Sequence, residues 1–248
     1  MQGGALLRQL LPILREIFAA AALRRAALLI LPYAGVLVGL DVAARYGEVT
    51  GAYLPAQFML SQDLSFGEYL EYALMLATAA LLFLLWRGEK ASPVYLVFAV
   101  LFVVLTADNA FEVHEKFGFW IAPLMPQGLP IEPHHLGEPV LFALIGLLWL
   151  AGMTHALRAS RPRATVHALI LTGCIGATAF FGIVVDEIVV FGAHTEAMTQ
   201  IQAFVEDGGE FAMIILTFLL TTAIFEIERR RARALGPEAA AAELALAA

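Results

Sequence analysis

Six apolar stretches constrain most strongly how this chain can fold. Five of them are long enough to cross about 30 Å of hydrocarbon as an α-helix, and the sixth reaches across with its polar ends. Hydrophobic residues make up 60% of the 248 positions and charged residues 15%, a balance rare in soluble domains. We therefore predict an all-α polytopic membrane protein built as a six-transmembrane-helix bundle.

The expected boundaries divide the chain into an N-terminal segment, a membrane domain and a tail. Residues 1–25 alternate apolar and charged side chains, as in an amphipathic helix on the membrane surface, although an extension of the first spanning helix remains an alternative. Residues 26–233 form the transmembrane domain, and the Ala-rich, acidic residues 234–248 form a disordered or frayed tail. The spanning helices are expected at 26–44, 65–86, 93–117, 139–157, 164–191 and 209–233.

Basic residues predict the orientation of this bundle. Thirteen of the 15 Lys and Arg lie in the two termini and in the links that share their side, and the other two are Arg45 and Lys116. Because basic residues are enriched in cytoplasmic segments, both termini are predicted to be cytoplasmic, in an inner membrane. The acidic residues show the opposite distribution, with 16 of 22 on the outer side.

The densest group of charges lies at 106–116, directly after an apolar run. Asp108, Glu112 and Glu115 have the i, i+4, i+7 spacing of one helical face. They would also sit at the C-terminal end of their helix, where the dipole disfavours negative charge. Such carboxylates must be protonated, solvated or bound to a cation.

Histidines on the same side make a divalent metal the simplest compensating cation. Carboxylate and imidazole ligands suit zinc, iron or manganese, while a lone cysteine, Cys174, excludes a thiolate cluster. Glu115 and Asp186 are the candidate general acid–base residues. The candidate metal ligands are Asp108, Glu112, His114, His134, His135, Glu138 and Glu210.

Several functions fit this pattern. The first is a metal-dependent hydrolase or oxidase that acts from the outer side on a lipid-like or small periplasmic substrate. A cation or proton transporter and a non-catalytic subunit of a membrane complex are the alternatives. The expected partners are the lipid bilayer and such a substrate, without nucleic acid, and the oligomeric state stays open.

A single acidic residue gives the chain a partial resemblance to a known family. Asp108 on an apolar helix resembles one feature of the membrane hydrolases related to alkaline ceramidases. Those enzymes combine seven helices with an H-x-x-x-H pair, and no such pair occurs in this sequence. We therefore carry over neither activity nor site residues, and the sequence assigns the chain to no family.

Overall fold

The computed structural model describes residues 3–88, 92–126, 132–185 and 195–246, and it contains no strand within those ranges. Short 3-10 turns connect some of the helices, at Ala56–Phe58 and Ala122–Leu124. The main helical elements are α1 (Gly3–Ala19), α2 (Ala21–Thr50), α3 (Phe66–Gly88), α4 (Val94–Phe111), α5 (Val113–Ile121), α6 (Pro133–Ala159), α7 (Pro162–Ala179), the π-helix η3 (Phe180–Val185) and α9 (Glu196–Leu246).

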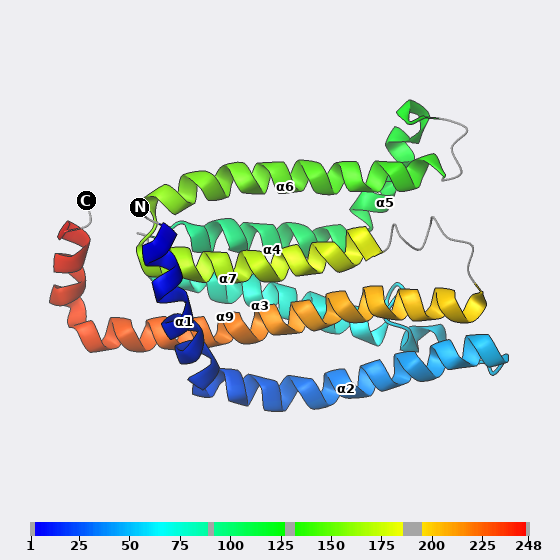
Figure 1. Cartoon of the computed structure of the whole chain (residues 1–248), viewed down its shortest axis with the longest axis horizontal. Coiled ribbons are helices and arrows are strands. Elements are labelled where there is room, and N and C mark those ends of the chain that lie inside the picture. The colour runs from blue at the N-terminus through cyan, green and yellow to red at the C-terminus, as the bar shows by residue number, and fades with distance from the viewer. Residues whose placement is uncertain (1–2, 89–91, 127–131, 186–194, 247–248) are drawn as a thin grey trace.

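Six helical segments are long and apolar enough to cross a membrane, which confirms the predicted all-α bundle. They are α2, α3, α4, α6, α7 continued by η3, and the first part of α9. Figure 1 shows these helices running roughly side by side, with both chain termini at one end and α5 at the other. An even number of crossings accounts for the termini sharing an end.

Helix α9 lies at the centre of the bundle and α6 at its edge. In their most apolar 18-residue windows, 56% of α9 is buried against 11% of α6. The core between α3, α4, α7 and α9 contains large side chains with almost no exposure, including Leu82, Phe98, Leu171 and Phe211. The exposed leucines of α6, such as Leu147 and Leu148, are typical of a surface that faces lipid.

Helix α1 is a separate element that packs across the end of the bundle carrying the termini (Figure 1). Ala20 has an extended backbone, with ψ 135°, which separates α1 from α2 and excludes a simple extension of the first spanning helix. Ile13 and Ile17 are buried, and Glu16 pairs with Arg163 of α7 at 2.7 Å. Part of the apolar face of α1 therefore contacts protein, while Leu11 and Phe18 remain exposed. The domain boundaries stay predictions.

The predicted helix 93–117 is wrong at its C-terminal end, because the helix is interrupted at Glu112. This residue adopts a left-handed conformation, with φ 49° and ψ 44°, and its N–H bonds to carbonyls of the last turn of α4. Such a residue ends a helix by satisfying its free carbonyls. Helix α5 then starts at Val113 in a new direction, so Asp108, Glu112 and Glu115 do not share a helical face.

Candidate metal centre

A cavity of about 240 Å³ lies inside the bundle, walled by α3, α4, α5, α6, α7, η3 and α9. Its polar lining comprises Asp108, Asn109, His114, Glu138, Thr178, Glu206, Glu210 and Thr217. The apolar part includes Met75, Phe102, Leu105, Phe142, Ile175 and Ile214. Four carboxylates and one imidazole thus meet in one cavity, and the described part of the chain contributes no lysine or arginine to its lining.

The break at Glu112 positions the histidine of this cavity. Because the chain turns back after α4, His114 faces the last turn of that helix, and its Nδ1 lies 3.1 Å from Oδ2 of Asp108. The His114 ring also lies against Phe142 of α6, with ring centroids 5.2 Å apart. The imidazole is therefore held between a carboxylate and an aromatic ring.

Asp108 is the most deeply buried acid of the cavity. Its side chain is 6% exposed, and the second oxygen, Oδ1, is buried without a hydrogen-bond partner among the described residues. Leaving a buried acceptor unsatisfied costs about 1–3 kcal/mol, and more for a charged one. Asp108 therefore presents a free oxygen in the wall of a cavity that could hold a cation.

The pKa of His114 is raised by its acidic surroundings. Burial alone would lower this pKa, but the hydrogen bond to Asp108 and the charges of Asp108, Glu138 and Glu115 outweigh burial. The Glu115 carboxylate lies 4.0 Å from Nε2 of the same imidazole. A raised pKa means that the protonated imidazole is favoured, so a proton competes with any metal for this ligand.

Gly182 of the π-helix makes room for Glu210. A Cβ atom at position 182 would overlap the Glu210 carboxylate, so the carboxylate lies directly against the glycine backbone. π-helical turns are uncommon and recur at functional sites. The wider turn of η3 and the missing side chain together let Glu210 of α9 reach the cavity.

The structure brings together only some of the predicted site residues. Asp108, His114, Glu138 and Glu210 line the cavity. Glu112 lies apart from it and pairs with Lys116 at 3.5 Å, with both side chains largely exposed, and Glu115 lies next to His114 without lining the cavity. Asp186 falls outside the described residues.

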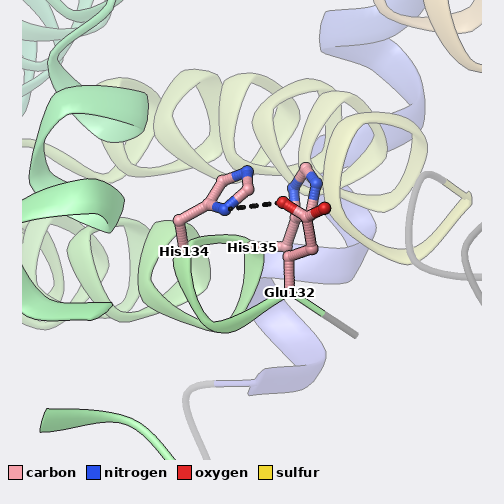
Figure 2. A group of neighbouring side chains, drawn as sticks. All are labelled: Glu132, His134 and His135. Carbon is pink, nitrogen blue, oxygen red and sulfur yellow. Dashed lines mark ion pairs between the residues drawn. The ribbon is translucent and has the colours of Figure 1, made fainter. Parts of the chain in front are cut away.

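His134 and His135 belong to a separate group near the surface, together with Glu132. One ligand atom from each of these three residues lies within 4.8 Å of the others. Figure 2 shows the Glu132 carboxylate beside both imidazole rings at the start of α6. Glu132 is not among the predicted site residues, although Glu132 and His135 have the E-x-x-H spacing of helical metal sites.

A second buried group of charges, also missed from sequence, joins α2 to α9. Arg45 pairs with Asp41 at 2.8 Å and with Asp207 at 2.5 Å. Asp41 is fully buried, and its other oxygen accepts a hydrogen bond from the Leu60 N–H at 2.8 Å. The i, i+4 spacing of Asp41 and Arg45 is the signal that could have revealed this pair.

The cavity lies entirely within the part of the chain that matches a known family. Residues 59–224 match the family described as "Domain of unknown function (DUF8692)", and the chain belongs to this family. Every lining residue of the cavity falls in the matched range, whereas α1 and α2 precede it. No curated protein and no solved structure matches the chain.

Proposed function

We propose that this member of the DUF8692 family binds a divalent metal ion in its cavity and uses it for hydrolytic or oxidative chemistry. The observation that carries the proposal is the charge of the lining. If the four carboxylates are ionised and His114 is protonated, the net charge is −4 + 1 = −3. Acidic side chains gathered in one cavity of a membrane bundle repel one another, and a divalent cation would offset that repulsion.

Asp108, His114, Glu138 and Glu210 are the proposed ligands. Three carboxylates and one imidazole, with the Asn109 amide nearby, favour Mn²⁺ or Fe²⁺ over a thiolate-preferring metal. A metal bound there would polarise a substrate oxygen or lower the pKa of a bound water. Glu206 is then the carboxylate left for general acid–base work, and Glu115 acts on the site by orienting His114.

The shape of the cavity limits the substrate. About 240 Å³ is below the roughly 300–1,000 Å³ of pockets that enclose drug-sized molecules. Phe102, Leu105 and Ile214 form an apolar wall beside the carboxylates. A small molecule, or the polar end of a lipid, fits this combination.

The proposed orientation places the cavity on the outer side of the cytoplasmic membrane. Arginines cluster at the end of the bundle that carries the termini, where Arg163 pairs with Glu228 and Arg25 with Glu226. Because basic residues are enriched in cytoplasmic segments, we propose that this end, with both termini, is cytoplasmic. The end carrying α5 then faces outward.

Transport of a cation or proton is the second candidate, favoured by polar groups buried between the cavity and the terminal end. His167 of α7 and Thr221 of α9 are fully buried, and each has a polar atom without a partner among the described residues. Buried ionisable groups in spanning helices are typical of ion pathways. Metal-dependent ion flux into liposomes would favour transport over catalysis.

Metal analysis of the purified full-length protein tests the proposal. We expect about one equivalent of manganese or iron in the native protein, and loss of most of it in the double variant Asp108→Asn, Glu210→Gln. Glu196→Gln is the matched control, since Glu196 is exposed at the start of α9 and outside the cavity. A native protein that retains no metal and binds no added Mn²⁺ would contradict the proposed function.

A further inference from the structure

We propose that Glu132, His134 and His135 form a second metal site, distinct from the cavity, that binds zinc. This group lies where α6 begins, with Glu132 preceding the helix and both histidines in its first turn. None of the three residues lines the cavity. The site therefore goes beyond the proposed function and does not depend on it.

The ligand atoms are already close to the spacing that zinc needs. In a tetrahedral site with bonds of about 2.0–2.1 Å, neighbouring ligand atoms lie roughly 3.3–3.4 Å apart. His134 Nδ1 and Glu132 Oε2 are 3.3 Å apart, and the three ligand atoms all lie within 4.8 Å of one another. Small side-chain rotations of the exposed Glu132 would close the remaining gap.

The types of ligand distinguish this site from the cavity. Two imidazoles and one carboxylate match the three-ligand sets of zinc sites that keep a fourth position open. The cavity instead offers mainly carboxylate oxygens, which suit harder metals such as Mn²⁺. Zinc is therefore expected to prefer the site formed by Glu132, His134 and His135.

Packing between α5 and α6 holds the first histidine in place. His134 stacks on Phe119 of α5, with ring centroids 4.3 Å apart and an interplanar angle of 14°. The two helices approach closely because both contact positions are glycines. A Cβ at Gly137 would lie 2.7 Å from the Cα of Gly118. A ligand fixed by packing loses little freedom when it binds a metal.

Glu138 supports the second histidine and connects the two sites. His135 Nδ1 lies 3.5 Å from Oε1 of Glu138, which leaves Nε2 of the same ring available for the metal. A carboxylate behind a ligating histidine orients the ring and strengthens its binding. Glu138 also lines the cavity, so one carboxylate contacts both groups.

The helix dipole opposes a cation at this place, but the local acids outweigh it. The start of α6 carries about half a positive charge. Glu132 and Glu138 together contribute two negative charges next to the histidines when both are ionised. The net local charge therefore favours a divalent cation.

Zinc titration by calorimetry tests the second site, using the full-length protein in detergent after metal removal. We expect the double variant His134→Ala, His135→Ala to bind zinc at least about tenfold more weakly than the native protein. The control His155→Ala removes an exposed histidine at the other end of α6 and should leave zinc binding unchanged. Equal zinc affinity in the native protein and the double variant would overturn the proposal.

Two further variants separate this result from misfolding and from the cavity. Glu132→Gln changes a residue with 76% of its side chain exposed, so it should weaken zinc binding at an unchanged melting temperature. The cavity variant Asp108→Asn, Glu210→Gln should retain the zinc site even if it loses the cavity metal. If instead the cavity variant abolishes zinc binding while Glu132→Gln retains it, zinc binds in the cavity and the second site is wrong.

Discussion

Two groups of buried acids meet on neighbouring residues of α9, and they differ in one component. Asp207 belongs to the group between α2 and α9, where Arg45 contributes a guanidinium. Glu206, the preceding residue, lines the cavity, and the described residues of its lining include no arginine or lysine. Adjacent positions on one helix thus belong to two groups of acids: the Arg45 group, which contains a guanidinium, and the cavity group, whose described basic side chain is the His114 imidazole.

The Arg45 group holds neighbouring elements of the fold together. The guanidinium of Arg45 contacts Asp41, Asp207, Ser61 and Gln200, so it links α2, α9 and the loop before α3. In the cavity, by contrast, Asp108 retains a buried oxygen without a partner among the described residues. Where the protein supplies its own cation the acids stabilise the fold, whereas the free oxygen of Asp108 is available for an external cation.

The largest expected effect on stability comes from removing the cation of the Arg45 group. Arg45→Met removes the guanidinium and leaves Asp41 buried without an opposite charge, which should cost about 3–5 kcal/mol in the free energy of unfolding. Arg25→Met is the control, because Arg25 is 70% exposed in its pair with Glu226 and should cost less than about 1 kcal/mol. Unfolding of both variants in detergent would measure the two losses. Equal small losses would mean that the Arg45 group does not stabilise the fold.

A medium effect is expected from filling the space that Gly182 leaves for Glu210. Gly182→Ala should cost about 1–3 kcal/mol through overpacking, and it should weaken binding of Mn²⁺ by displacing the carboxylate. Gly176→Ala, on the same membrane segment, adds a Cβ with nothing within 4 Å and should leave Mn²⁺ binding unchanged. Similar Mn²⁺ affinity in both variants would show that Glu210 is not a ligand.

The smallest effect on stability is expected when one carboxylate charge is removed from the cavity group. In the metal-free protein, Asp108→Asn should change the free energy of unfolding by less than about 1 kcal/mol, because it relieves repulsion while losing the bond to His114. Asp41→Asn, an identical chemical change, should cost about 1.5–3 kcal/mol, since Asp41 bonds a guanidinium. Chemical unfolding of both variants measures the two losses in the free energy of unfolding. A larger loss for Asp108→Asn than for Asp41→Asn would contradict the difference between the cavity group and the Arg45 group.

The sequence predicted the bundle because hydropathy is a property of long segments. All six spans are apparent from apolar runs. The ends of α9 differ from the prediction, because this helix begins at Glu196, before the expected start at 209, and continues through the described part of the predicted tail to Leu246. Helix α3 begins with half of a capping box. Ser65 Oγ accepts the Glu68 N–H at 3.1 Å, but the Glu68 carboxylate accepts the N–H of Leu64.

The site was less predictable because it depends on two local departures from α-helical geometry. A left-handed Glu112 has no sequence signal of its own, since glycine and asparagine are the usual residues there. The π-helical turn at Phe180–Val185 is similarly invisible in an apolar run. Asp108 and Glu210 were both predicted as ligands and both line the cavity, but the sequence could not separate His134 and His135 from them.

The thermal response to chelation tests the metal centre most directly. A ligand at 100 times its dissociation constant stabilises the folded state by about 2.7 kcal/mol, so chelation should lower the melting temperature in detergent and Mn²⁺ should restore it. The double variant Asp108→Asn, Glu210→Gln should stay folded and lose the recovery of its melting temperature by Mn²⁺, whereas Glu132→Gln should keep it. A native melting temperature that neither chelator nor Mn²⁺ changes would contradict the metal centre, and protonated carboxyls bonded among the helices would then explain the cavity.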